Sequence, residues 1–205
     1  VITHLHPDHV GSGKAWWNNT VAMRGASEAW AELPIYVPAK TAYPDATISR
    51  EPAQFAPDVG STGALPYAEG FPFSLFAPTG VEQALVIHVA GEGLVLVTGC
   101  GHPALKNMVI RAQTLYQEPV VGVVGGLHYG NADAEALTGP IGFVRSRPIQ
   151  LLALSPHDSG PEALSTFESA FPDHYDTLRV GERFSSPQSL DTGPLPRNRS
   201  QTVVE

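Results

Sequence analysis

The sequence predicts one α/β domain, because strongly apolar runs alternate with segments of helical pattern. The runs at 120–124 and 149–154 are continuous, which is typical of strands covered on both faces of a sheet. A chain of 205 residues can form one sizeable hydrophobic core. We therefore expect a single domain over residues 1–185, followed by a polar, proline-bearing, disordered tail at 186–205.

Only short elements are expected in the first third of the chain. Trp16 and Trp17 are expected to pack against the core. Residues 38–72 are rich in proline, alanine and glycine without sustained periodicity, so we expect them to be irregular. They could form a wall over an active site or a surface insertion. The expected elements are the end of a strand at 2–5, helices at 8–18 and 25–33, and a strand at 35–38.

The pattern is more regular from residue 73 onward. The Gly-Glu-Gly segment at 91–93 is typical of a hairpin turn, and Pro161 suits the first turn of a helix. Strands are expected at 73–77, 84–90, 93–97, 120–124, 149–154 and 177–180. Helices are expected at 107–116 and 161–170, with short helices or turns at 132–138 and 140–146. The first of these helices is expected to bury Met108, Ile110, Ala112 and Leu115.

Composition excludes several classes of partner. The formal charge of −8 disfavours a surface that tracks phosphates, so we expect no nucleic-acid partner. Bound metal cations would reverse this sign locally, so a small anionic substrate is compatible with it. Cys100 is the only cysteine, which excludes an intrachain disulfide. No apolar run approaches the ~20 residues of a membrane span and no signal peptide is visible, so we expect no membrane partner and a cytoplasmic location. The sequence leaves the oligomeric state open.

The segment T-H-L-H-P-D-H-V-G at 3–11 concentrates metal-ligand chemistry. If residues 2–5 end a strand, its two-residue period places His4 and His6 on the same side. Asp8 and His9 then open a turn or first helical turn that faces the same space. Imidazole and carboxylate ligands suit zinc, iron or manganese. The alternative is a solvated, histidine-rich turn.

Three further histidines each follow a strongly apolar strand. His102 follows the strand at 93–97, and His128 and His157 follow the two continuous apolar runs. Strand ends at one edge of a layered α/β fold gather functional groups, because the loops there converge. We therefore expect these histidines to share a site with the opening segment. His88 and His174 are expected to lie outside it, in a strand and a surface turn.

The opening segment matches H-x-H-x-D-H and resembles the metallo-β-lactamase superfamily. Three later segments are similar to one branch of it, which includes the archaeal dihydropterin synthases. T-G-C-G-H-P at 98–103 resembles T-G-C-S-H-P of this branch, G-G-L-H at 125–128 resembles G-G-F-H, and S-P-H-D-S-G at 155–160 resembles P-C-H-C-T-G. Asp158 stands where the last pattern has a cysteine, which weakens the transfer of that branch's reaction.

The resemblance implies a four-layer αβ/βα sandwich. Members of the superfamily place several strands before the opening motif, whereas this sequence begins at Val1 and reaches the motif almost at once. We therefore expect the first N-terminal strands, and any leader before them, to be missing. Such a loss would leave a sheet edge and one apolar face uncovered.

The resemblance also implies a ligand set for two divalent ions, with zinc expected and manganese or iron as alternatives. His4 and His6 would hold the first ion, and Asp8 and His9 the second. His157 would complete the second site and His102 the first. Many members carry a histidine where this chain has G-V-E-Q at 80–83, so that ligand is absent or replaced. Cys100 takes the place of a bridging aspartate and is either a ligand or an inert buried thiol.

The expected function is metal-dependent hydrolysis of a small ester, lactone, amide or phosphoester. Paired cations generate hydroxide near neutral pH, and Asp8 would orient it and accept its proton. His128 would bind substrate or stabilise an anion, unless its role is structural. Two alternatives remain open, a transferase or condensing enzyme acting on a phosphorylated pterin-like substrate and a catalytically silent metal-binding fragment. A serine hydrolase is excluded, because no G-x-S-x-G segment is present.

Overall fold

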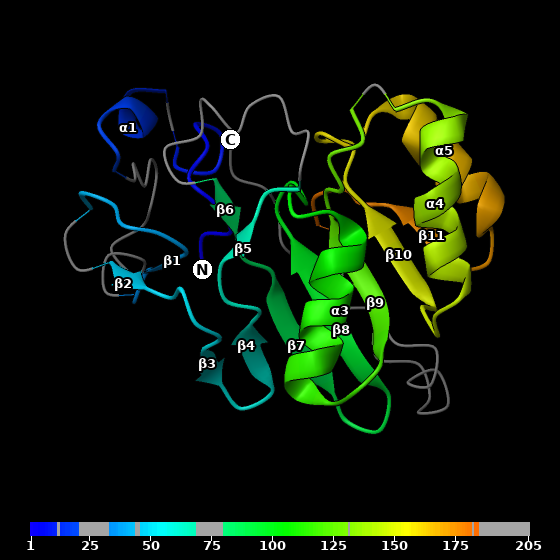
Figure 1. Ribbon diagram of the computed structural model, residues 1–205, viewed down its shortest axis with the longest axis horizontal. Helices are drawn as coiled ribbons and strands as arrows, with labels where there is room; N and C mark the ends of the chain where they lie inside the picture. Colours follow the sequence, from blue (N-terminus) through cyan, green and yellow to red (C-terminus); the bar gives the residue numbers. More distant parts are fainter. Residues whose placement is uncertain are drawn as a thin grey trace, which may run out of the picture.

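A computed structural model describes residues 1–11, 13–20, 33–43, 46–68, 80–130, 132–181 and 183–184. Its centre is a mixed sheet of seven strands in the order β11-β10-β9-β8-β7-β4-β3 (Figure 1). One half is parallel and consists of β8 (Gly93–Thr98), β9 (Val120–Gly125), β10 (Leu151–Leu154) and β11 (Tyr175–Thr177). The other half is antiparallel and consists of β7 (Leu85–Val89), β4 (Val59–Ser61) and β3 (Gln54–Ala56).

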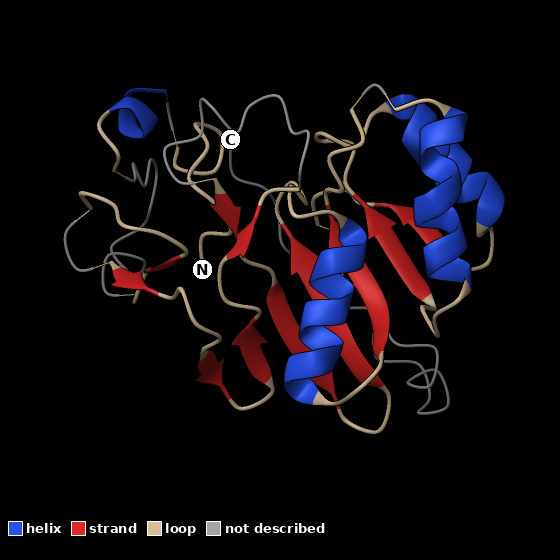
Figure 2. Ribbon diagram, in the orientation of Figure 1, coloured by secondary structure: helices blue, strands red, loops and turns tan. Residues whose placement is uncertain are grey.

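Each step along the parallel half is made through a helix. Helix α3 (Leu105–Tyr116) connects β8 to β9, α4 (Ala134–Arg145) connects β9 to β10, and α5 (Pro161–Ala170) connects β10 to β11. Figure 2 shows α3 lying across β8 and β9, with α4 and α5 packed together at one end of the sheet. None of the described helices is long and apolar enough to cross a membrane.

The main core lies between these helices and the sheet. In β8, Leu94 and Leu96 are buried in it, whereas their neighbours Val95 and Val97 point to the other face and are half-buried. The helices contribute, among others, Met108, Leu137 and Phe167. The two-residue period of β8 thus gives the sheet one face packed against helices and one less covered.

A second, smaller core supports the start of the chain. It contains Leu5, Val10 and Val37. Around it lie a short helix α1 (Gly13–Trp17), a parallel pair of β1 (Tyr36–Val37) and β2 (Thr47–Ile48), and an antiparallel pair of β5 (Leu65–Pro66) and β6 (Val81–Glu82). Figure 1 shows the N-terminal segment beside β5 and β6.

The predicted α/β class is confirmed. Most predicted elements are also confirmed within one or two residues, namely the strands at 35–38, 84–90, 93–97, 120–124 and 149–154 and the helices at 107–116 and 161–170. The last strand lies earlier than predicted, and the two short helices at 132–138 and 140–146 form the single helix α4 with Pro140 inside it. Ile110 is exposed rather than buried, and Val109 takes its place in the core. The predictions at 25–33, 73–77 and 186–205 lie outside the described residues.

Three predictions for the first third were wrong. Residues 2–5 are not in a strand and instead make isolated backbone bonds, including Ile2 N to Tyr36 O at 2.9 Å. The helix begins only at Gly13, because residues 6–10 form a turn in which His9 N and Val10 N donate to His6 O. Trp17 is 82% exposed rather than packed.

The prediction of an irregular segment at 38–72 was also wrong, since β2, β3, β4 and β5 lie within it. Strand β4 is short and contains Gly60, where a Cβ atom would collide with the side chain of Tyr116. The Tyr116 hydroxyl donates to the carbonyl of Ser61 at 3.0 Å. A strand of three residues shows too little alternation for a period to be read, so contacts with α3 and β7 define it instead.

Candidate metal centre

The candidate site lies where three parallel strands end. The loops after β8, β9 and β10 carry His102, His128 and His157, respectively. Because the carboxyl ends of parallel strands meet at one edge of a sheet, these three loops are neighbours. Histidine rings from the N-terminal segment join them there, with the His4 and His102 centroids 4.6 Å apart.

Gly99 allows the N-terminal segment to come this close. A Cβ atom at this position would collide with the side chain of Thr3 and lie 3.2 Å from His4 Nδ1. On the other side, the Thr3 carbonyl accepts a hydrogen bond of 2.8 Å from Gln83 N. The residue that begins the loop after β8 therefore has to be small for His4 to reach the sheet.

The first histidine group consists of His4, His6 and His102. Their ring centroids are 4.6 to 4.7 Å apart, and one donor atom of each lies within 4.8 Å of the others. His4 and His102 are buried. His4 Nε2 is buried and has no hydrogen-bond partner among the described residues. A nitrogen lone pair held in this way suits a divalent cation.

The histidines of the N-terminal segment are neutral at pH 7. Burial lowers the pKa of His4 far below its ordinary value and lowers the pKa of His6 to about 4. Neighbouring imidazoles lower both pKa values further, since adjacent cationic rings would repel each other. Burial also lowers the pKa of His9. Neutral imidazole is the form that binds metal.

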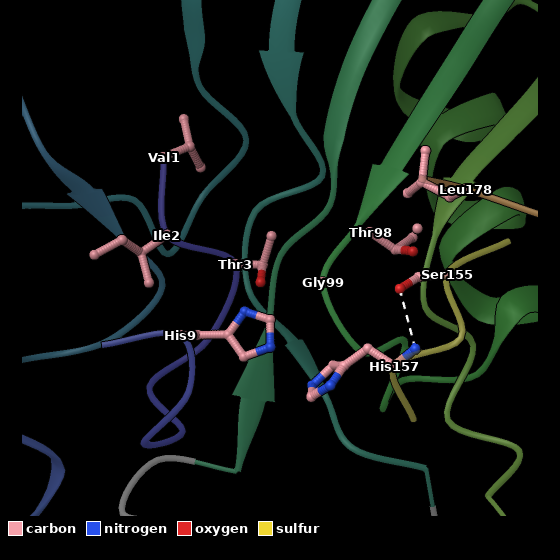
Figure 3. Close-up of a pocket in the computed structure, with 10 residues that line it drawn as sticks. Val1, Ile2, Thr3, His9, Thr98, Gly99, Ser155, His157 and Leu178 are labelled. Carbon is pink, nitrogen blue, oxygen red and sulfur yellow. Dashed lines mark hydrogen bonds between the residues drawn. The ribbon is translucent and has the colours of Figure 1, made fainter. Parts of the chain in front are cut away.

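The second donor group consists of Asp8, His9, Cys100 and His157, whose donor atoms lie within 4.8 Å of one another. His157 Nε2 is 2.7 Å from Asp8 Oδ2, and His9 Nε2 is 3.2 Å from Cys100 Sγ. Figure 3 shows His9 and His157 approaching each other from different segments of the chain. Burial, and then a hydrogen bond to Asp158, raises the pKa of the Cys100 thiol. The thiol is therefore protonated unless a bound cation displaces its proton.

Asp158 joins the two groups and was not predicted as a site residue. It forms a third donor set with Cys100 and His102, and its Oδ2 accepts a 3.0 Å hydrogen bond from the Cys100 thiol. The same oxygen is 3.5 Å from His128 Nδ1 and 3.6 Å from His157 Nε2. Burial alone raises its pKa, but the thiol hydrogen bond and the imidazoles outweigh burial and hold the pKa below its ordinary value. The departure from the family pattern at this position was the signal that could have identified it.

His128 lies at the rim of the first histidine group, with its ring 4.5 Å from that of His102. Burial lowers its pKa, so the ring is neutral at pH 7. His128 has a φ of 52° and Asp158 a φ of 58°, in the left-handed region that residues other than glycine rarely adopt. Such conformations cluster at functional sites, where the surrounding structure holds them.

Tyr67 was also missed, because it lies in the segment predicted to be irregular. Its hydroxyl is 3.3 Å from His6 Nε2, and its ring stacks on His102 at 4.4 Å. Burial raises the pKa of the phenol, so it keeps its proton at pH 7. The sequence offers no spacing that would place this residue at the site.

Glu82 was missed as well, although the G-V-E-Q segment had marked the place where a ligand was absent or replaced. Its side chain is fully buried, and Oε2 accepts a 2.7 Å hydrogen bond from His102 Nδ1. Burial alone raises the pKa of Glu82, but hydrogen bonds from His102 and from the Gly101 backbone outweigh it and hold the pKa below its ordinary value. An acidic residue shortly before an apolar strand was the available signal.

The other two histidines are not among the three donor groups found in the described residues. His88 lies in β7, where Nδ1 is 3.3 Å from Asp58 Oδ1 and Nε2 is 3.0 Å from Glu118 Oε2. His174 precedes β11, and its carbonyl accepts a hydrogen bond from Leu152 N.

A cavity of about 350 Å³ adjoins the second donor group through His9 and His157. Figure 3 shows these two side chains at its edge and Thr98 and Ser155 above them. Its volume lies in the range of sites for small molecules, roughly 300–1,000 Å³. The lining residues are Val1, Ile2, Thr3, His9, Thr98, Gly99, Gly125, Ser155, His157 and Leu178.

Comparison with known proteins finds similarity both to a curated protein and to a solved structure, and no family model matches the chain. Over 150 residues the sequence is 24% identical to 7,8-dihydropterin-6-methyl-4-(beta-D-ribofuranosyl)-aminobenzene-5'-phosphate synthase of Methanocaldococcus jannaschii. That match covers 66% of this chain and 51% of the synthase, so the chain spans about half the length of this relative.

The second similarity is to the crystal structure of Tm1679, described as a metal-dependent hydrolase of the β-lactamase superfamily. The TM-score is 0.53 at 19% sequence identity, and the match covers 69% of this chain and 58% of the other. The chain therefore shares its fold with this hydrolase of the β-lactamase superfamily, as the H-x-H-x-D-H segment predicted.

Proposed function

We propose that this chain carries the catalytic centre of a metal-dependent hydrolase that uses two divalent ions, with zinc as the first candidate. The observation that carries the proposal is the convergence of the first histidine group and the second donor group at one edge of the sheet. The buried, unpartnered Nε2 of His4 and the low pKa values of His4, His6 and His9 fit a cation better than a solvated turn.

The first histidine group would hold one ion, and Asp8, His9 and His157 the other. Cys100 is the added donor of the second site, since its sulfur lies within 4.8 Å of the donor atoms of the other three. When bound, paired divalent ions supply a water of lowered pKa and polarise a carbonyl or phosphoryl oxygen. A mixed set of imidazole, carboxylate and thiol suits zinc.

The chain's own residues would then handle the proton and the developing charge. Asp8 is partly exposed, and its carboxylate can orient a water molecule and accept its proton. Neutral His128 and the protonated phenol of Tyr67 can each donate a hydrogen bond to an oxygen that gains negative charge. The adjoining cavity fits a small ester, lactone, amide or phosphoester.

The second candidate function is a transfer or condensation on a phosphorylated pterin-like substrate. The observation that favours it is the similarity to the dihydropterin-type synthase of Methanocaldococcus jannaschii over 66% of this chain. The two functions share the metal centre and differ in their products. The metal-loaded chain is incubated with panels of esters, lactones and phosphoesters and, separately, with a pterin phosphate. Analysis of the products then distinguishes the two functions.

The metal centre itself is tested by metal analysis of the purified chain. We expect two zinc ions per chain, loss of hydrolysis on chelation and recovery on adding zinc, manganese or iron. A chain that holds no metal after reconstitution, or that hydrolyses its substrate fully without metal, would contradict the proposal. Two bound ions with no turnover on any panel would support the catalytically silent alternative.

A further inference from the structure

We propose that Glu82 and Gln83 are paired positioning residues, which hold the two ligand-bearing segments of the first histidine group together and fix the orientation of His102. This inference rests on the proposed metal centre. The two residues are neighbours at the end of β6, and both side chains are fully buried. Neighbouring side chains in extended backbone point in opposite directions, so one short segment can hold two different partners.

Glu82 holds the loop that carries His102. Its Oε1 accepts hydrogen bonds from the backbone N–H groups of Gly99, Cys100 and Gly101 at 3.2, 3.1 and 3.0 Å. Its Oε2 accepts from His102 N at 2.9 Å. Four consecutive backbone donors therefore point at one carboxylate, which fixes the course of the loop.

The same carboxylate determines which nitrogen of His102 can bind a metal. Glu82 Oε2 is 2.7 Å from His102 Nδ1. An ionised carboxylate only accepts hydrogen bonds, so Nδ1 must carry the proton and Nε2 keeps its lone pair. A carboxylate in this position also makes the ring a stronger ligand.

Gln83 holds the segment that carries His4 and His6. Its side-chain Nε2 donates to the carbonyl of Ile2 at 3.0 Å, and its backbone N–H donates to the carbonyl of Thr3 at 2.8 Å. The remaining acceptor, Oε1, receives a 2.8 Å hydrogen bond from Ser49 Oγ. Gln83 is thus bonded on both sides, and the bonds to Ile2 and Thr3 fix the backbone directly before His4.

A structural role alone would not require a charge here. Glu82 is the only buried carboxylate among the described residues, and burying one costs more free energy than burying an apolar side chain of similar size. What the carboxylate adds is a set of directed hydrogen bonds, which join the loop after β8 to the end of β6. The bonds of Gln83 then join the end of β6 to the N-terminal segment. Placing ligands from two distant segments within reach of one ion requires such support.

The test is the nearly isosteric variant Glu82→Gln in the whole chain. A glutamine amide has one acceptor, so its N–H₂ group must face either the three loop N–H groups or the His102 donors. Either arrangement displaces the loop or reverses the His102 tautomer. We expect affinity for the first ion to fall roughly 10- to 100-fold, as for other residues that orient ligands. Competitive titration with zinc and cobalt measures the metal affinity of each site. His157→Ala is the matched control, because it should weaken binding of the second ion instead.

A second measurement needs no metal. Nitrogen-15 shifts of the His102 ring in the metal-free chain should show the Nδ1–H tautomer in the wild type and its loss in Glu82→Gln. Gln83→Met, which keeps the side-chain length but removes both side-chain hydrogen bonds, should weaken the first ion and leave the His102 tautomer unchanged. It also carries the test if Glu82→Gln does not fold.

Unchanged first-ion affinity in folded Glu82→Gln and Gln83→Met, or equal loss of both ions, would overturn the inference. A wild-type chain that binds no metal would instead overturn the proposed function. The tautomer measurement distinguishes the two failures, because it reports on Glu82 in either case.

Discussion

At the scale of single residues, the two donor groups predict different consequences for substitution. His6→Ala removes a ligand from the first histidine group, so we expect it to lose bound metal and activity together. His174→Ala is the matched control, because this histidine is in none of the described donor groups. Metal content by mass spectrometry and turnover under the same conditions check both variants. Full metal content in His6→Ala would show that His6 is not a ligand.

Asp8→Asn should separate binding from catalysis. The asparagine amide keeps one oxygen that can coordinate the metal, but it cannot act as a base. Some metal should therefore be retained while turnover falls by about 10²- to 10⁴-fold. The measurement is turnover per bound ion. An activity loss that follows metal loss in strict proportion would make Asp8 a ligand only.

Cys100 gives a spectroscopic prediction. Its sulfur lies among the donors of the second group, and a thiol that coordinates a metal ion is deprotonated, because the cation displaces its proton. The cobalt-loaded chain should therefore show thiolate-to-cobalt absorption in the near ultraviolet, and Cys100→Ser should lose it. Absorption spectra that are identical in the two proteins would identify Cys100 as an inert buried thiol.

At the scale of elements, the contact between the N-terminal segment and the end of β8 can be tested through one methyl group. In Gly99→Ala the new Cβ would collide with Thr3 and press on His4, so we expect loss of the first ion with the sheet intact. Gly139→Ala is the matched control, since nothing lies within 4 Å of a Cβ there and the residue is inside α4. Metal stoichiometry reports the loss of the first ion, and the unfolding temperature reports whether the sheet is intact. Normal metal binding by Gly99→Ala would contradict this account of the contact.

The same scale shows how far the sequence could predict the molecule. Strands β7 to β10 and helices α3 and α5 were predictable, because their apolar residues either form continuous runs or repeat over enough positions to reveal a period. Residues 54–61 were not, since β3 and β4 have three residues each and depend on neighbours elsewhere in the chain.

The candidate site divides in a similar way. The histidines that follow apolar strands could be found from the sequence, because each one comes shortly after the predicted end of such a strand. Tyr67 could not, because its partners are the ring of His102 and a nitrogen of His6, which leave no pattern of spacing. Glu82 was indicated only by its place before an apolar strand, since its backbone N–H partners leave no such pattern either. Asp158 lay between these cases, visible as a departure from a family pattern but not as a donor.

At the scale of the whole molecule, the buried histidines predict a dependence of stability on pH. His6 has a pKa of about 4 in the folded chain against 6.5 for an ordinary histidine, and the pKa values of His4, His9 and His128 are also lowered. Below pH 6.5 the unfolded chain therefore binds more protons than the folded one. The free energy of unfolding of the metal-free chain should be highest above pH 6.5 and fall as the pH drops from there towards 4.

Urea denaturation of the metal-free chain at a series of pH values measures this fall. His6→Ala should show a shallower pH dependence than the wild type, because it removes one of the contributing groups. His88 acts in the opposite sense, since its pKa is raised by Asp58, but its side chain is partly exposed. Stability that does not change between pH 7 and 5 would show that these imidazoles are not held neutral by folding.

The passage of the N-terminal segment over the end of β8 has a kinetic consequence. His4 and His102 are far apart in the sequence, so their meeting requires closure of a long loop, which is slow compared with forming the β7–β8 hairpin. During refolding, strand pairing should therefore precede capture of the first ion. Stopped-flow refolding with a zinc indicator should show zinc uptake lagging behind the change in circular dichroism. Metal uptake would then report the moment at which the two ends of this long loop come together.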